Sequence, residues 1–139
     1  MRRLAILVAL AVMVTSCTSS APPAAPSNAP TSDPGPPPPI PTTDGATLTL
    51  TSSGVAPRQV RVYQGSRVTF VNNDTNAHDI QSNPLHLHTD CPELNAVGYV
   101  VPGQSRASAS LTVVRGCGFH DHVNEGDSRY YGAVFVDPR

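Results

Sequence analysis

Short apolar runs, several of which alternate with polar residues, recur through the second part of the chain. They occupy residues 47–51, 60–63, 67–72, 78–81, 97–101, 108–114 and 133–136, with Gly, Pro, Asn and Asp between them. Alternation with a period of two suits strands, whereas an amphipathic helix needs a period near 3.6. Regular short strands with turn residues between them predict an antiparallel β-sandwich or barrel. The least strand-like stretch, residues 82–95, is predicted to be a long loop.

The first 45 residues are predicted to lie outside the folded domain. Arg2-Arg3 followed by the apolar run from Leu4 to Val14 is typical of a secretory signal, and the run is too short to span a membrane. Residues 18–45 hold ten of the fifteen prolines and cannot bury a core, so they predict a disordered, extended stalk. We therefore expect a signal peptide over residues 1–16, a linker over 17–45 and one domain over 46–139.

The end of the apolar run resembles a bacterial lipobox, in which a small residue precedes a Cys. Here the segment is Val14-Thr15-Ser16-Cys17. The resemblance implies cleavage before Cys17 and acylation of its thiol. The lipid on Cys17 would anchor the exported chain to the membrane of a bacterial cell envelope, on its periplasmic or extracellular face. The alternative is an ordinary signal peptide in which Cys17 is incidental.

The two remaining cysteines, Cys91 and Cys117, admit two interpretations. Export places them where disulfides form, and an even pair outside the cytoplasm is most often a disulfide. Cys117 also begins a Cys-x-x-His step that ends at His120, which is a ligand pattern of copper sites. The sequence leaves both the disulfide and the thiolate ligand open.

All five histidines of the chain lie between His78 and His122. Imidazole and thiolate ligands packed this densely suggest a transition metal, and copper before the others. His120 and His122 would face the same side of an extended segment, because side chains two residues apart share a face. The expected metal ligands are His78, Cys117, His120 and His122, with His86 and His88 as weaker candidates from the predicted loop.

Composition argues against several other function classes. The formal net charge is −1, all basic residues are Arg, and no basic patch is visible, so we expect no nucleic-acid partner. The sequence shows no Ser-His-Asp arrangement, phosphate-binding loop or paired carboxylates, and no substrate site is evident. A hydrolase or kinase has no support, and an enzyme that uses copper with an open coordination position is supported by the histidines alone.

The domain resembles the cupredoxin family. Residues 55–74 are similar to the family's second and third strands with their turn, and residues 132–136 to its last strand. His78 falls where the family has its first copper His, and Cys117-Gly118-Phe119-His120 resembles its Cys-x-x-His step. The resemblance implies an all-β, cupredoxin-like antiparallel Greek-key β-sandwich that binds copper. Residues 83–92 and 117–122 also resemble a variant among exported bacterial lipoproteins, with a His-rich loop and a Cys-x-Phe-His-Asp-His segment.

The chain departs from the family pattern at its ligand loop. Tyr130 stands where the family usually has a Met, residues 123–128 look like an insertion, and three histidines are surplus. If Cys117 is a thiolate ligand, electron transfer is the natural role. If Cys117 bonds Cys91, the disulfide would bring His86 or His88 toward His120 and His122, and an all-imidazole site would suit Cu(II) storage better than fast electron exchange.

These observations lead to one expected function and one alternative. We expect a cell-envelope lipoprotein whose copper-binding domain serves electron transfer or copper handling, with a redox or copper-delivery protein as partner. The alternative is a non-redox binding or structural module with a Cys91–Cys117 disulfide and an all-His or absent metal site.

Overall fold

The computed structural model describes residues 43–139. The predicted signal peptide, Cys17 and nearly all of the predicted linker lie outside these residues. The first strand begins at Thr43, inside the range predicted to be linker. Within the described part of the chain, no helix is long and apolar enough to cross a membrane.

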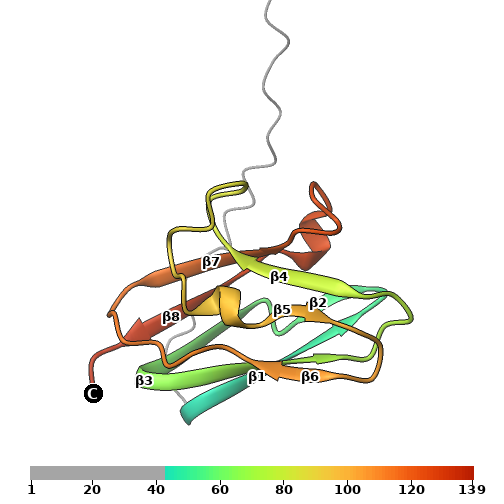
Figure 1. The fold of residues 1–139 in the computed structure, drawn as a ribbon. Helices are drawn as coiled ribbons and strands as arrows, with labels where there is room; N and C mark the ends of the chain where they lie inside the picture. Colours follow the sequence, from blue (N-terminus) through green and yellow to red (C-terminus); the bar gives the residue numbers. More distant parts are fainter. Residues whose placement is uncertain (1–42) are drawn as a thin grey trace, which may run out of the picture.

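The described residues form eight strands and two short 3-10 helices (Figure 1). The strands are β1 (Thr43–Thr51), β2 (Gly54–Ala56), β3 (Gln59–Asn72), β4 (His78–Ser82), β5 (Gly98–Val100), β6 (Ser105–Ala107), β7 (Gly116–Asp121) and β8 (Gly132–Asp137). The helices are η1 (Leu94–Ala96) and η2 (Ser128–Tyr130). The prediction of an all-β sandwich is confirmed.

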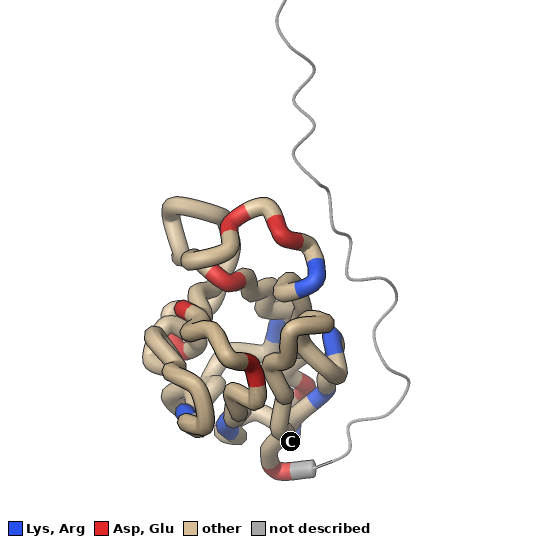
Figure 2. The backbone as a smooth tube through the Cα atoms, turned by 90° about the vertical axis from the view of Figure 1, so that its right-hand side faces the viewer, with Lys and Arg blue, Asp and Glu red and all other residues tan. Residues whose placement is uncertain are grey.

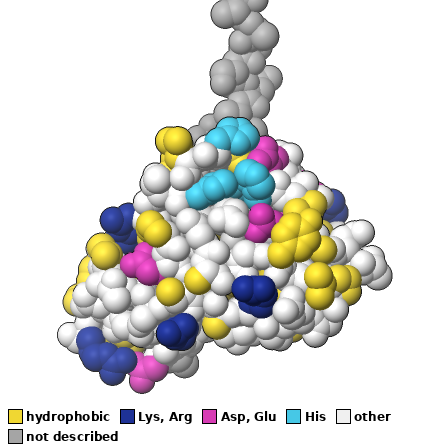
Figure 3. All heavy atoms as spheres, in the orientation of Figure 1, with side chains coloured by type: hydrophobic (Ala, Val, Ile, Leu, Met, Phe, Trp, Pro, Cys, Tyr) yellow, Lys and Arg dark blue, Asp and Glu magenta, His cyan; other side chains and the backbone are white. Residues whose placement is uncertain are grey.

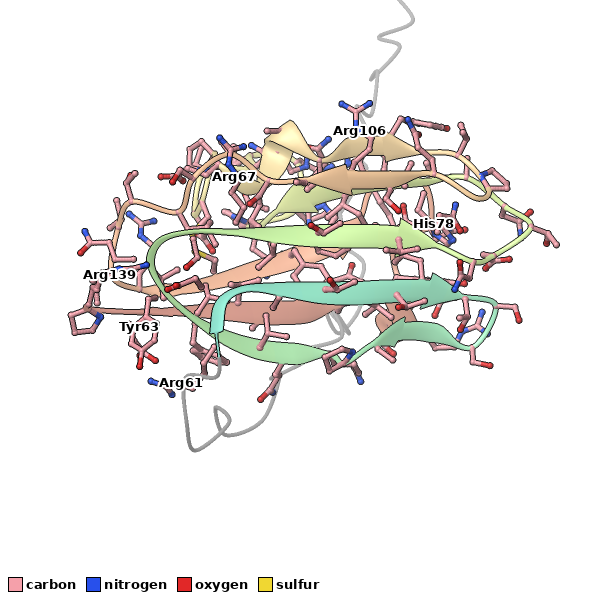
Figure 4. All side chains as sticks on the ribbon, turned by 90° about the horizontal axis from the view of Figure 1, so that it is seen from below. Arg61, Tyr63, Arg67, His78, Arg106 and Arg139 are labelled. Carbon is pink, nitrogen blue, oxygen red and sulfur yellow. A yellow bond between two sulfur atoms is a disulfide. The ribbon has the colours of Figure 1, made fainter. Side chains whose placement is uncertain are left out.

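The strands pair in the order β2-β1-β3-β8-β7-β4-β5, and β6 adds to β3. Strand β3 belongs to both layers of the sandwich, because residues 59–63 pair with β8 and residues 67–72 pair with β1. Figure 4 shows the ribbon of β3 turning back on itself between these two halves. Gly65 lies between them with a φ of 90°, a left-handed conformation that glycine adopts at little cost. Figure 1 shows β4, β7 and β8 above β1, β3 and β6.

The core fills the space between the two layers. Burial along β3 alternates with the expected period of two, and Val62, Val68 and Phe70 have no exposed surface. Phe119 of β7 meets Phe70 edge to face, with ring centroids 5.1 Å apart. Aromatic pairs in this arrangement contribute about 0.5–1.5 kcal/mol beyond the area they bury. The core thus fixes β7, which carries two of the candidate ligands.

One predicted strand is wrong. Residues 108–114 alternate in sequence, yet the structure ends β6 at Ala107 and leaves these residues outside any strand. Leu111 is buried, but Val113 and Val114 are 46% and 48% exposed, so the alternating apolar residues do not share one buried face. The backbone of Leu111 bonds instead to the turn of β3, donating to Ser66 O and accepting from Gly65 N.

Candidate metal centre

Three histidines from two distant segments meet at one end of the sandwich. His120 belongs to β7, His122 follows that strand, and His88 lies in the loop after β4. One nitrogen from each ring lies within 4.8 Å of the others. The ring of His88 lies 5.2 Å from that of His120 and 4.9 Å from that of His122. We refer to His88, His120 and His122 as the three-histidine group.

A disulfide holds the loop that carries His88 against the strand that carries His120. Cys91 and Cys117 are bonded, with Cα atoms 5.6 Å apart. Each cysteine lies three residues from one of these histidines, and both cysteines are buried. Of the two interpretations of Cys117, the structure contains the disulfide, so the expectation of Cys117 as a thiolate ligand does not hold here. A sulfur already bonded to another sulfur offers no thiolate to a metal.

Backbone and amide hydrogen bonds shape the same loop. Asn83 N donates to Gly118 O of β7 at 2.9 Å, and the side chain of Asn95 donates to His88 O at 2.9 Å. His86 and His88 have φ values of 69° and 54°. Residues other than glycine keep a left-handed backbone only where the surroundings hold it, often at functional sites. The fold therefore imposes the conformation that presents these two imidazoles.

His120 has the protonation pattern of a metal ligand. It is fully buried, and its Nδ1 lies 3.0 Å from Asn83 Oδ1. Because that oxygen only accepts, Nδ1 carries the proton and Nε2 keeps its lone pair. Nε2 of His120 and Nε2 of His88 are both buried without a hydrogen-bond partner. Buried polar atoms are almost always paired, so two orphaned imidazole nitrogens in one group indicate a missing ligand.

Burial and like charges keep His120 neutral. Loss of hydration lowers the pKa of His120 below its ordinary value of 6.5, and His88 and His122 lower that pKa further. Metal binding requires an unprotonated imidazole nitrogen. The three-histidine group can therefore bind a metal without first losing a proton from His120.

Replacing Asn83 with alanine is expected to weaken metal binding without unfolding the domain. The change removes the acceptor that holds the proton of His120 on Nδ1, and partners of this kind are worth roughly 10- to 100-fold in metal affinity. The check is a competition titration of both proteins with Cu(II). An unchanged affinity in a correctly folded Asn83→Ala protein would show that Asn83 does not orient His120.

The lowered pKa of His120 also makes the metal-free protein sensitive to mild acid. In the unfolded chain His120 takes up a proton near pH 6.5, whereas in the folded protein it does so only at a lower pH. The contribution of His120 to the free energy of unfolding is therefore complete above about pH 6.5 and is lost as the pH falls toward the lower pKa of the folded state. Urea unfolding of wild type and His120→Gln at several pH values measures this contribution. We expect the stability difference between the two proteins to shrink as pH falls below about 6.5, and a constant difference would contradict it.

His78 lies in a separate, fully buried cluster. Its Nδ1 is 2.7 Å from Asp121 Oδ2, its Nε2 is 3.4 Å from Asp74 Oδ2, and its ring packs against Tyr130 at 4.6 Å. The structure thus does not bring His78 to the three-histidine group, although the family resemblance placed it with Cys117 and His120. The structure brings together His78 and Tyr130, the two positions that the resemblance assigned to the first His and the axial ligand.

The cluster around His78 is held by hydrogen bonds on all sides. Asp121 accepts from the backbone of Asp79 and Val123 and from the side chain of Asn124. The hydroxyl of Tyr130 donates to Asp74 Oδ2 at 3.0 Å, and burial together with this carboxylate raises the pKa of Tyr130 to about 12. Asp121 holds Nδ1 of His78, whereas Nε2 is buried 3.4 Å from Asp74 Oδ2 without a hydrogen-bond partner, and the cluster as a whole fixes the end of β7.

His86, the remaining candidate, lies at the outer edge of the three-histidine group. Its Nδ1 is 3.8 Å from Glu125 Oε1, and the same oxygen is 2.9 Å from Nδ1 of His122. Figure 3 shows histidine side chains gathered at the upper end of this face, with an acidic side chain beside them. Asn83 and Glu125 act through contacts that only the fold creates, so the sequence pattern does not mark them.

A shallow pocket lies next to His120. It has a volume of about 270 Å³ and is lined by Asn83, Gly116, Gly118, Tyr131, Gly132, Ala133 and Phe135. Asn83 bonds the ring of His120, and the ring of Tyr131 lies 5.9 Å from it. A Cβ at Gly118 would come within 2.2 Å of the Asn83 amide, so glycine there leaves room for the residue that orients His120.

Comparison with known proteins gives a clear result for the fold alone. No protein-family model and no curated protein sequence matches the chain. Among solved structures, it is similar to a purple cupredoxin from Nitrosopumilus maritimus, with 16% identity, a TM-score of 0.53, and coverage of 66% of this chain and 99% of the other. Plastocyanin from the fern Dryopteris crassirhizoma gives 15% identity and a TM-score of 0.51, with the same coverage. Auracyanin from Roseiflexus castenholzii gives 16% identity and a TM-score of 0.51, and the match covers 70% of this chain and 99% of auracyanin.

These likenesses agree with the strand order and the sandwich described above. Each match covers nearly the whole length of the solved protein. The sequence identities are so low that the matches support a shared fold and nothing further. The described part of this chain therefore has the cupredoxin fold.

Proposed function

We propose that this protein binds copper through His88, His120 and His122 and holds it as Cu(II) for storage or delivery. The observation that carries the proposal is the convergence of three imidazole rings with a nitrogen from each within 4.8 Å of the others, together with the buried, unpartnered Nε2 atoms of His88 and His120. Imidazole suits copper well, and copper binds such sites more tightly than the other divalent first-row metals.

The fold and the ligand set point to copper handling more than to electron transfer. A solved neighbour with the same fold is amicyanin with Cu(I), which supports copper as the ligand here. Both cysteines within residues 43–139, Cys91 and Cys117, are bonded to each other, so neither offers a thiolate to the group. Without a thiolate, the site lacks the ligand that gives blue-copper centres their electron-transfer properties, and an all-imidazole set favours the oxidised ion.

The proposed setting is the bacterial cell envelope. A lipid on Cys17 and the proline-rich stalk would attach the domain to a membrane and hold it some distance away, at about 3.1 Å per stalk residue in polyproline geometry. The partner would be a protein that donates copper to the site or accepts it. A membrane-attached copper store fits such an exchange.

A copper titration that also monitors folding tests the proposal against a structural role for the metal. We expect the metal-free protein to give the circular dichroism of a folded sandwich and to bind one Cu(II) in competition with a chelating indicator. The variant with His88, His120 and His122 all replaced by alanine should stay folded and bind none. Folding that depends on metal would instead favour a structural site, because structural metals supply the folding free energy themselves.

A further inference from the structure

The three-histidine group has an outer rim formed by His86 and Glu125. The carboxylate of Glu125 bridges the two parts, because its Oε1 lies 2.9 Å from Nδ1 of His122 and 3.8 Å from Nδ1 of His86. The rings of His86 and His122 are 6.4 Å apart and face each other edge-on. His122 therefore lies between His88 and His120 on one side and the rim on the other.

Exposure to solvent rises in steps along this row of side chains. His120 is fully buried, the side chain of His122 is 39% exposed, and that of His86 is 68% exposed. Each step is spanned by a contact between neighbouring ligand groups. A cation moving between solvent and His120 along this row would meet a new donor before it left the previous one.

The charge at this end of the molecule favours a cation. Figure 2 shows acidic positions, with a basic position beside them, along the loops at the upper end, which is the end that carries the histidines in Figure 3. Asp121 faces the buried His78, whereas Glu125 reaches the rim. A carboxylate in such a place raises the local concentration of cations and speeds their association. The imposed backbone conformation of His86, with φ of 69°, adds an exposed imidazole to the same place.

We propose that His86 and Glu125 form a transient copper site through which the ion enters and leaves the three-histidine group. This inference rests on the copper-binding function proposed above. At each step one bond from the ion to an imidazole or carboxylate forms as another breaks, with His122 shared by the inner and outer positions. The ion remains Cu(II) throughout, so the exchange needs no oxidant or reductant.

The rates of copper entry and release test the rim directly. In stopped-flow experiments, Cu(II) is mixed with the metal-free protein, and the loaded protein is mixed with EDTA. In the double variant His86→Ala/Glu125→Gln, we expect both rate constants to fall by about tenfold or more, the scale on which local charge alters association. Because a route acts equally in both directions, the single variant His86→Ala, which leaves the contact between Glu125 and His122 in place, should slow entry and release alike without changing the equilibrium Kd.

Two single variants from the same loop serve as controls. Leu87→Ala removes an exposed side chain between the two loop histidines, and Asp90→Asn removes a negative charge from an exposed position. Both should exchange copper at the wild-type rate. Wild-type rates in the double variant would overturn the rim proposal, and so would a weaker Kd with an unchanged entry rate, which would make the pair ordinary ligands. If the wild-type protein takes up no copper, the proposed copper-binding function is itself wrong.

Discussion

Replacing His120 with alanine should abolish tight copper binding. His120 is the buried member of the three-histidine group, and its Nε2 is buried without a hydrogen-bond partner. Loss of an outer partner of a metal ligand costs roughly 10- to 100-fold in affinity, so loss of the ligand itself should cost about a hundredfold or more. The measurement is a Cu(II) competition titration of wild type and His120→Ala, with circular dichroism to establish that both are folded.

The matched control for this variant is His78→Gln. His78 is equally buried, but its two ring nitrogens face Asp121 and Asp74 rather than the other histidines. Glutamine keeps a polar side chain beside these carboxylates, because leaving a buried charge without a partner costs several kcal/mol. The control should lower stability while keeping the copper affinity of wild type. Loss of copper in His78→Gln together with full binding in His120→Ala would place the site where the family resemblance put it.

Removing the disulfide should lower both stability and copper affinity. The bond between Cys91 and Cys117 closes a segment with a sequence separation of 26. For a loop of this length, chain-entropy reasoning gives a loss of about 3.5 kcal/mol in the free energy of unfolding. Copper affinity should also fall, because the loop with His88 would lose its attachment to β7 and would have to be ordered when the metal binds. Urea unfolding and copper titration of Cys91→Ser/Cys117→Ser measure the two effects.

Reduction of the wild-type protein provides the matching control. Opening the disulfide of wild type, blocking both thiols by alkylation and removing the reagents before Cu(II) is added should shift its copper affinity toward that of the double serine variant, and the same treatment should leave the variant unchanged. The ligands of the three-histidine group are identical in both proteins. If the copper affinity of wild type is the same with the disulfide intact and opened, the loop keeps His88 in place without the disulfide.

The fold was predictable because its signal is local. Alternation along residues 67–72 marks a strand that is half buried, and the structure shows that period in the burial of β3. Turn residues such as Gly65 also act through their own backbone preferences. The prediction failed for residues 108–114, where alternation is present but the exposed Val113 and Val114 have no layer to cover them.

The candidate site was predictable only in part, because the predicted strands did not include β7. Residues 116–121 form a strand, so side chains of residues 117, 119 and 121 alternate with those of 118 and 120. His120 and His122 were correctly expected to share a side. Cys117 and His120, three residues apart in an extended strand, point to opposite sides, and His78 packs with Asp121.

The contribution of His88 required the folded loop. Its position depends on the disulfide and on the hydrogen bond from Asn95, seven residues along the chain. The local sequence does not show that His88 rather than His86 joins the group, because both lie in a loop without a periodic pattern of apolar residues. The orienting role of Asn83 likewise depends on a residue 37 positions away.

The most direct test of the account is the absorption and paramagnetic resonance spectrum of the purified protein as Cu(II) is added. We expect one Cu(II) per chain, weak d–d absorption, and hyperfine coupling to imidazole nitrogens that disappears in the variant lacking His88, His120 and His122. These features would establish an all-imidazole site beside an intact Cys91–Cys117 disulfide. An intense thiolate-to-copper band that is lost in Cys117→Ser would contradict the account, and so would a protein that binds no copper.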